Sequence, residues 1–235
     1  IQTEIADGVA TVTLNRAEKK NALTFDMFDA LFEAAEALRD APIRAVILAG
    51  AGGAFSAGLD LSMMMAMAGK LDDIRADLEN EGAHGNRFQR PVTVWASLPV
   101  PVIAAVEGVC FGAGAQLALG ADFRVMHPAA RFAIMEAKWG LIPDMGITQS
   151  LPTLLPADKA KWLMMTAQEL TGAEAQELGL STEVSETPLD RAREMAVQLA
   201  SRSPEAVAAS KRLVDDLETG LALEAELQAQ LIGSA

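Results

Sequence analysis

Cysteine, histidine and tyrosine are scarce in this chain of 235 residues, which has one cysteine, two histidines and no tyrosine. The single cysteine, Cys110, excludes an intrachain disulfide and favours a reducing compartment such as the cytoplasm, although bacterial extracellular proteins can also lack disulfides. We expect Cys110 to be a small buried apolar residue. With only His84 and His127 available, the sequence suggests neither a metal cluster nor a Ser/His/Asp arrangement.

Basic residues and long apolar runs are also few. The 19 lysines and arginines face 32 acidic residues, and the net charge of -13 argues against nucleic acid because no basic stripe is present to contact phosphates. Apolar runs stop well short of the roughly 20 residues that a membrane span requires, and no basic, apolar leader opens the sequence. With 51% hydrophobic residues, the chain is expected to bury a substantial core as one large domain or as a domain with an appendage.

One stretch, residues 102–120, has the pattern of a strand, a tight turn and a helix. An apolar run rich in β-branched residues is followed by Gly112-Ala113-Gly114 and then by a helix-favouring segment. Glycine permits positive φ and close approach of a ligand, and the first amides of a helix have no intrahelical partner. Such a turn suits an anion or an oxygen that becomes negative during a reaction. The alternative is a buried turn filled with small residues.

A second glycine-rich loop, residues 50–56, follows a short buried strand expected at residues 45–49. Two such turns would present two backbone amides to one oxygen, which is the minimum for an oxyanion hole. The loop does not match the dinucleotide-binding pattern G-x-G-x-x-G, because Phe55 stands at the sixth position and no acidic residue ends a strand about 20 residues on.

The remaining chain alternates between strand and helix patterns. We expect a β-hairpin over residues 1–14, a helix over 25–39 capped by Thr24, and a helical pattern over 71–95 that is interrupted at 82–85. Strands are expected at 123–126, 131–134 and 182–185, and helices at 151–155, 158–167, after Pro188, after Pro204 and at 221–231. The methionines within residues 62–69 suit either an adaptable pocket wall or ordinary core packing.

Two carboxylates, Glu136 and Asp144, flank an apolar stretch. A carboxylate among apolar side chains loses hydration, so its pKa is expected to rise toward a value useful for proton transfer. The alternative is that Glu136 pairs with Lys138 or Arg131 on the surface.

Several motifs, in order along nearly the whole chain, resemble the crotonase, or enoyl-CoA hydratase/isomerase, superfamily. They are Asn21-Ala22-Leu23, Phe55-Ser56-Ala57-Gly58-Leu59-Asp60-Leu61, residues 108–122, residues 136–140 and residues 145–149. The resemblance implies an α/β fold, a crotonase-like (Clp-protease-like) spiral of ββα units over residues 1–187, with a helical region over residues 188–235 that joins trimers, often paired into hexamers. It implies a coenzyme A thioester as substrate and no separate cofactor.

The same resemblance assigns roles to residues of the two loops. The amides of Leu59 and Ala113 would form the oxyanion hole, although the family usually has glycine at the second position. Residues that would contact the CoA arm or the substrate are Lys20 (or its neighbour Lys19), Ala22, Ser56, Ala57, Asp60, Leu61 and Gly112.

The acid/base positions differ from the hydratase pattern. Family hydratases use glutamates at the positions of Gln116 and Glu136, and Gln116 can orient a water but cannot transfer its proton. Dienoyl-CoA isomerases of the family keep a carboxylate at the position of Asp144, but they usually also have an aspartate where Gln116 stands, so the match is partial. We therefore predict a double-bond isomerase with Glu136 as proton shuttle and Asp144 as an assisting acid or pocket charge.

Three alternatives stay open. The first is a hydratase that uses Glu136 and a water held by Gln116. The second is hydrolase or decarboxylase chemistry on the same enolate-stabilising scaffold. The third is an acyl-CoA binder or assembly subunit without catalysis, which Gln116 and Ala113 make plausible.

Overall fold

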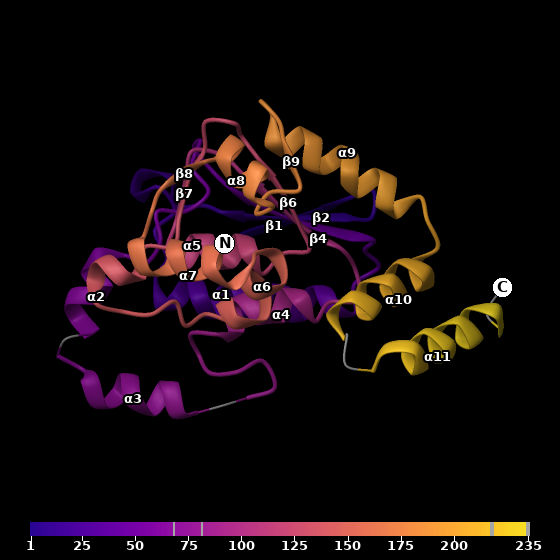
Figure 1. Cartoon of the computed structure of the whole chain (residues 1–235), viewed down its shortest axis with the longest axis horizontal. Coiled ribbons are helices and arrows are strands. Elements are labelled where there is room, and N and C mark those ends of the chain that lie inside the picture. The colour runs from indigo at the N-terminus through magenta and orange to yellow at the C-terminus, as the bar shows by residue number, and fades with distance from the viewer. Residues whose placement is uncertain (68, 81, 217–218, 234–235) are drawn as a thin grey trace.

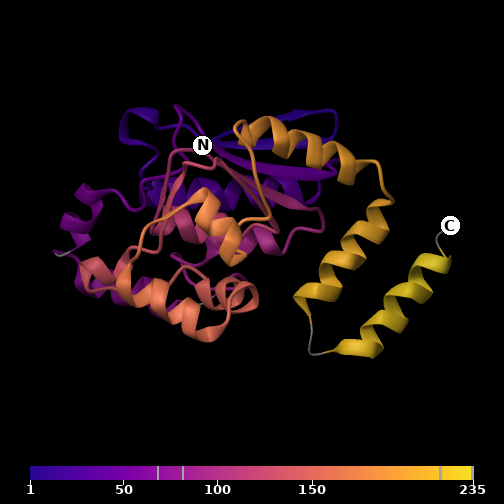
Figure 2. The same cartoon turned by 45° about the horizontal axis from the view of Figure 1, so that its top comes forward.

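The computed structural model describes residues 1–67, 69–80, 82–216 and 219–233. Its body is a β-sheet with helices on both faces (Figure 1). Two C-terminal helices extend from one end of this body, as Figure 2 also shows. The expected α/β class is confirmed.

The larger sheet has six strands in the order β1-β2-β3-β4-β6-β9. These strands are β1 (Gln2–Ala6), β2 (Val9–Leu14), β3 (Ala45–Gly50), β4 (Val102–Val106), β6 (Phe123–Met126) and β9 (Glu183–Val184). The first two form the expected antiparallel hairpin, and every later pair is parallel. Because parallel neighbours need long crossover connections, helices return the chain across the sheet between them.

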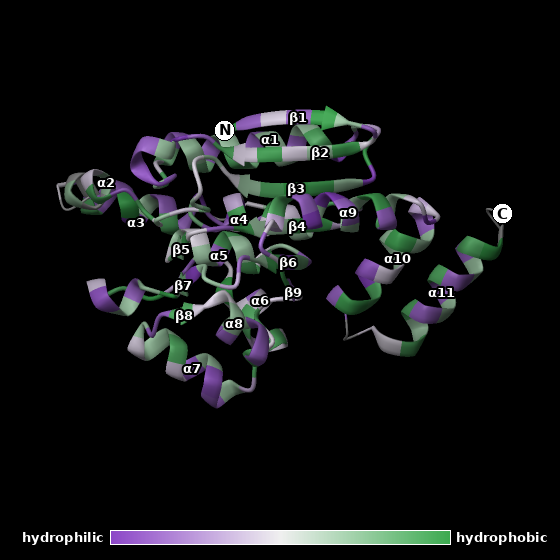
Figure 3. Cartoon of the chain, turned by 90° about the horizontal axis from the view of Figure 1, so that it is seen from above, coloured by the Kyte–Doolittle hydropathy of each residue, from purple (hydrophilic) through white to green (hydrophobic). Residues whose placement is uncertain are grey.

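Both faces of the central strands are buried, which explains why their sequences are apolar throughout. Val46 and Leu48 of β3 contact one hydrophobic cluster, whereas Ala45, Ile47 and Ala49 contact a second one on the opposite face. In Figure 3, β2 and β3 are accordingly mostly green. The period-two alternation therefore sorts residues between two cores, not between core and solvent.

A second, smaller sheet has the order β5-β7-β8. Its strands are β5 (Val109–Phe111), β7 (Arg131–Ala133) and β8 (Leu170–Thr171). The sequence analysis did not predict β5, because it assigned these residues to the turn before the helix. Since β5 ends at Phe111, the helix that follows begins at Ala113, two residues earlier than expected.

Helices cover the two faces of the large sheet. The α-helices are α1 (Phe25–Arg39), α2 (Leu61–Met67), α3 (Leu71–Glu79), α4 (Arg90–Ala96), α5 (Ala113–Leu119), α6 (Ile147–Leu154), α7 (Ala157–Thr166), α8 (Gly172–Leu178), α9 (Pro188–Ala200), α10 (Pro204–Asp215) and α11 (Gly220–Gly233). Two short 3-10 helices are η1 (Ala17–Lys19) and η2 (Glu136–Trp139). The expected cap of α1 is present, since Thr24 accepts a hydrogen bond from the amide of Met27. At the start of α8, Thr171 forms a capping box with Glu174.

The C-terminal helices differ in how they meet the body. Ala192, Met195 and Ala196 of α9 are buried against the second face of the sheet, so α9 is structurally part of the body. By contrast, none of the residues of α10, all of which are described, is buried, and α10 and α11 lie at the opposite end of the molecule from α2 and α3 (Figure 1). The sequence pattern of the helix after Pro204 places Leu217 on its apolar face, but Leu217 and the last residue, Ala235, lie outside the described residues. Within the described residues, no helix combines the length and the apolar character needed to span a bilayer.

Candidate active site

A cavity of about 870 Å³ lies where the two glycine-rich loops meet. In chain order, the first of these loops is residues 50–59 and the second is residues 107–114. The cavity wall includes Leu59 of the first, Ala113 of the second, and the side chains of Gln116, Glu136 and Asp144. The same cavity is therefore bordered by residues that the sequence analysis selected for different reasons. These residues are up to 85 positions apart in the chain.

The loops approach each other closely at Gly58, which has a φ of +92°. A carbon placed at its Cβ position would lie 2.8 Å from the carbonyl oxygen of Phe111 and 3.8 Å from the amide nitrogen of Ala113, so only glycine fits. Neither Leu59 N nor Ala113 N donates a hydrogen bond within the described part of the chain. Two unpartnered amides on the wall of one cavity are the arrangement that a developing oxyanion requires.

Ser56 joins these two loops from beneath and is fully buried. Its amide donates to Val109 O at 3.0 Å and its carbonyl accepts from Phe111 N at 2.9 Å. Its hydroxyl donates to Asn21 O at 2.9 Å and accepts from Gly58 N at 3.1 Å. The resemblance placed Ser56 against the substrate, but the structure places it under the loops, where it fixes their spacing.

Asn21 has a structural role that the sequence analysis did not assign. It is fully buried and adopts a left-handed conformation, with a φ of 54°. Its side-chain amide donates to Ala51 O at 2.9 Å and Ala54 O at 2.7 Å, and its Oδ1 accepts from Arg16 N at 2.8 Å. Asn21 thus ties the loop around η1 to the first glycine-rich loop. Its place in the Asn21-Ala22-Leu23 motif was the available signal.

The residues expected along the CoA arm are mostly at the cavity. Ala22, Ala57, Asp60, Leu61 and Gly112 border it. Of the two lysines, Lys19 borders the cavity, whereas the carbonyl of Lys20 accepts a hydrogen bond from Ala57 N at 2.8 Å and its exposed side chain is not part of the wall. A contact of Lys20 or Lys19 with CoA stays a prediction, and Lys19 is the one of the two that borders the cavity.

Asp60 carries a charge that is already neutralised. Its carboxylate accepts hydrogen bonds from the hydroxyl and amide of Ser62 and from Arg16 Nη1, the last at 2.5 Å. The hydrogen bond from the Ser62 hydroxyl, followed by that from Arg16, holds the pKa of Asp60 well below its usual range. Asp60 therefore stays ionised and paired, which suits anchoring of the loop and of α2, not proton transfer.

Glu136 lies at the start of η2, half-buried, with its carboxylate facing Gln116. Gln116 Nε2 donates to Glu136 Oε1 at 2.7 Å, whereas the buried Oε2 has no hydrogen-bond partner among the described residues. Burial raises the pKa of Glu136, and the charge of Asp144 raises it further against the opposing hydrogen bonds. The surface alternative is wrong, since Arg131 pairs with Glu169.

Asp144 completes a group of three polar side chains at one end of the cavity. Burial raises the pKa of Asp144 as well. The neighbouring amide, Met145 N, donates to Gln116 Oε1 at 2.8 Å, so Gln116 links the segment that carries Asp144 to Glu136. The expected meeting of Gln116, Glu136 and Asp144 at one site is therefore present.

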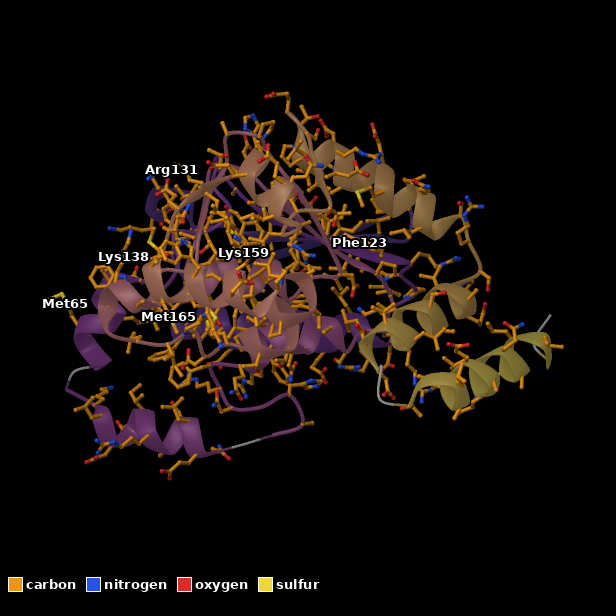
Figure 4. The ribbon with its side chains drawn as sticks, in the orientation of Figure 1. Met65, Phe123, Arg131, Lys138, Lys159 and Met165 are labelled. Carbon is orange, nitrogen blue, oxygen red and sulfur yellow. The ribbon has the colours of Figure 1, made fainter. Side chains whose placement is uncertain are left out.

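The methionines of α2 do not form the cavity wall as far as the structure describes them. Met63 Sδ accepts a hydrogen bond from Phe25 N at 3.0 Å, and Met65 is 80% exposed and points away from the body (Figure 4). The side chains of Met64 and Met67 lie outside the described residues. The apolar wall comes instead from Phe28, Phe88, Ile74 and Leu78, which the sequence analysis had not assigned to a site.

The model of the family described as enoyl-CoA hydratase/isomerase matches residues 4–234. The chain belongs to the enoyl-CoA hydratase/isomerase family. It is 36% identical over 224 residues to the 1,2-epoxyphenylacetyl-CoA isomerase of Escherichia coli, covering 93% of this chain and 83% of the relative. It is also 36% identical over 227 residues to the short-chain-enoyl-CoA hydratase of Clostridium acetobutylicum, covering 93% and 84%.

Solved structures of this family have the same fold. The enoyl-CoA hydratase from Polaromonas sp. JS666 matches with a TM-score of 0.88 at 31% identity, covering 97% of this chain and 90% of that one. A family structure from Thermobifida fusca YX in complex with CoA matches with a TM-score of 0.87 at 29% identity, covering 99% and 93%. The crotonase fold is thus confirmed. The relatives include both hydratases and an isomerase, so the family alone does not distinguish these reactions.

Proposed function

We propose that this crotonase-family protein is a double-bond isomerase that acts on enoyl-CoA or dienoyl-CoA thioesters. The observation that carries the proposal is the state of Glu136. Gln116 holds one of its oxygens, and the other is buried on a cavity shared with the amides of Leu59 and Ala113; among the described residues, neither this oxygen nor these amides has a hydrogen-bond partner. This arrangement provides one general base and one oxyanion site. A shift of a double bond needs no more than these two elements.

In the proposed reaction, the thioester carbonyl oxygen accepts hydrogen bonds from Leu59 N and Ala113 N. Glu136 Oε2 removes a proton from C2 of a 3-enoyl thioester, and the electron pair of the C–H bond delocalises into the thioester as a dienolate. The same carboxyl group then returns the proton to C4, which leaves the double bond between C2 and C3. No proton is lost to solvent, so one carboxylate is sufficient. Each oxyanion donor is worth about 3 kcal/mol in the barrier by analogy with measured deletions.

The second candidate is hydration of a 2-enoyl thioester, the reaction named for the Clostridium relative. The nearness of Asp144 to Glu136 favours it, because Asp144 would supply the second acid/base group that Gln116 cannot provide. Against it, the amide of Gln116 is engaged at both ends, by Glu136 and by Met145 N. These two bonds fix the orientation of the amide and leave only its second N–H and one lone pair of its oxygen for a water.

A panel of CoA thioesters tests the proposal. The purified protein is incubated separately with 3-enoyl-, 3,5-dienoyl- and 2-enoyl-CoA of equal chain length, and the products are identified by mass and by ultraviolet absorbance. We expect isomers of unchanged mass from the first two. Rapid formation of products heavier by one water from 2-enoyl-CoA, with the other two untouched, would contradict the proposal. Acyl-CoA binding with no turnover in the whole panel would favour the non-catalytic binder.

We also propose that the protein assembles as a homotrimer or as a dimer of trimers through its C-terminal helices. Large apolar side chains are exposed on α10 and α11, with Val214 at 71%, Leu221 at 80% and Ile232 at 71%. Such a surface is costly to leave in water and suits a contact with another copy. Light scattering coupled to size exclusion gives the mass directly, and a monomer at micromolar concentration would rule this assembly out.

We infer a reducing compartment, the cytoplasm, from the buried thiol of Cys110. Burial raises the pKa of this thiol, so it is inert toward oxidation. Fractionation of the source cells tests this placement.

A further inference from the structure

Helix α3 forms one wall of the cavity but is hardly packed on the body. None of its nine residues, all of which are described, is buried. In Figure 1 it runs along the lower edge, apart from the sheet and its covering helices. Ile74 and Leu78 nevertheless border the cavity, together with Phe28 of α1 and Phe88. A wall with so little packing of its own needs other contacts to keep its position.

Two polar ties hold the C-terminal turn of α3. Asn86 Nδ2 donates to Leu78 O at 3.2 Å. Arg87 Nη1 lies 3.5 Å from Asp77 Oδ2, while its Nη2 pairs with Asp29 of α1 at 2.7 Å. Both ties come from the segment that leads into α4, so they connect the loosely packed wall to the core.

Asn86 is placed to act as the firmer of these ties. It is 5% exposed, and its Oδ1 accepts from Phe88 N at 3.0 Å and Gln89 N at 3.1 Å. One buried amide group therefore fixes the backbone of both Leu78 and Phe88, two apolar residues of the wall. A buried amide with satisfied partners holds its geometry, because loss of a partner leaves a polar atom uncompensated.

The chemistry of this part of the cavity points to an uncharged occupant. Its wall is aromatic and aliphatic, and the acidic groups on the wall of the same cavity, which include Glu136 and Asp144, would repel an acyl group that ends in a carboxylate. Arg16 borders the cavity, but its charge is already paired with Asp60 and so is not available to a carboxylate on the acyl group.

We propose that α3 is the wall that limits the size of an apolar acyl group and that Asn86 is the positioning residue that holds α3 in place. This inference rests on the proposed acyl-CoA substrate. Release of α3 should let the cavity accept additional methylene groups. Each methylene that becomes buried only in the released state is expected to tighten binding by about fourfold. Binding of the CoA part should not change, because none of the residues expected along the CoA arm belongs to α3.

The experiment measures Kd by calorimetry for free CoA and for saturated butyryl-, octanoyl- and dodecanoyl-CoA, none of which can be isomerised. Asn86→Asp keeps the Oδ1 acceptor for Phe88 N and Gln89 N but removes the donor to Leu78 O. Asp77→Asn removes the ionic part of the second tie at a partly exposed site. Asp72→Asn is the matched control, because Asp72 is almost fully exposed on the same helix and pairs, as far as the structure describes the chain, only with Arg75, at 3.4 Å.

The preference is the ratio of the Kd for butyryl-CoA to the Kd for dodecanoyl-CoA. We expect Asn86→Asp and Asp77→Asn to raise this ratio by about fourfold or more, with an unchanged Kd for free CoA. In Asp72→Asn the ratio should stay unchanged. Equal preferences in all four proteins would overturn the inference while leaving the proposed function intact. If the wild-type protein bound no acyl-CoA, the proposed function and this inference would both be overturned. Should Asn86→Asp fold poorly, Asp77→Asn decides the result.

Discussion

Gln116 donates a hydrogen bond of 2.7 Å from its side-chain amide to Oε1 of Glu136. Its orientation is fixed from the other end, because its oxygen accepts from Met145 N at 2.8 Å and a flipped amide would place two donors against each other. Glu136 Oε1 is therefore bonded, whereas Oε2 has no hydrogen-bond partner in the part of the chain that the structure describes. Gln116 thus orients the carboxylate of Glu136, the proposed base, in addition to bordering the cavity.

The first prediction concerns Gln116→Glu. A carboxylate at position 116 can still accept from Met145 N, but it cannot donate to Glu136 unless it is protonated. Two carboxyl groups at this distance share a proton, and the apparent pKa of the pair rises. We expect isomerisation at pH 7 to fall by about 10²-fold or more, since the base is removed or misplaced. Steady-state kcat with 3-enoyl-CoA measures this effect.

Gln116→Met is the matched control, because it keeps the side-chain volume and has no donor or charge. It should lose activity without the upward shift in the pH profile. A hydratase that is slowed by glutamine at this position would respond in the opposite sense, and faster hydration of 2-enoyl-CoA by Gln116→Glu would contradict our assignment.

The second prediction concerns pH. Burial raises the pKa of Glu136, so the base is ionised only above a pH higher than the usual 4.5. The rate constant kcat/KM should therefore increase with pH through an inflection above that value. Because the charge of Asp144 also raises the pKa of Glu136, Asp144→Asn should move the inflection to lower pH. A profile of Asp144→Asn that coincides with that of the wild type would show that the two carboxylates do not interact.

Much of this site was predictable from the sequence, because it depends on main-chain geometry that leaves a local signature. A buried strand, small residues and a helix start are visible as a pattern, and the two loops were found in this way. The individual amides of Leu59 and Ala113 were assigned from the family resemblance. The carboxylates were identified by residue type and by the apolar residues around them.

Other features had no local signal because they depend on distant partners. Ser56 was expected at the substrate, but its contacts with Asn21 and Val109 place it beneath the loops. The three residues of β5 form a strand only because β7 lies beside them. The wall formed by α3 was likewise missed, since the hydrogen bond from Asn86 to Leu78 joins residues whose pattern is that of an ordinary exposed helix and loop.

The third prediction tests the contact between the two loops. A Cβ at Gly114 would lie 2.6 Å from Ser56 Cβ and 3.0 Å from Ser56 O, too close for either to remain in place. Gly114→Ala should therefore separate Leu59 N from Ala113 N and lower kcat by about 10²-fold, the effect of losing one oxyanion donor. The affinity for free CoA, measured by calorimetry, should change little.

Gly82→Ala serves as its control, since the nearest atom to the added carbon is Gly85 O at 3.6 Å and no strain is expected. Unchanged turnover in Gly114→Ala, with a correctly folded protein by circular dichroism, would mean that the spacing of the two amides is not what stabilises the transition state.

The last prediction concerns Lys211, which fastens α10 to the body. Its ammonium group donates to Asp122 Oδ2 at 2.9 Å and to Val100 O at 3.2 Å, and its side chain is only 10% exposed. Lys211→Met removes the cation that pairs with Asp122 and leaves this carboxylate less well compensated. Because α10 has no buried residue, we expect the substitution to release α10 and α11. Chymotryptic cleavage within residues 204–233 should then increase by about tenfold. Arg212→Met is the neighbouring control, since Arg212 is half-exposed and lies 3.9 Å from Glu226, a pair worth about 0.5 kcal/mol. Equal cleavage rates in the two variants would show that α10 is held by contacts other than Lys211.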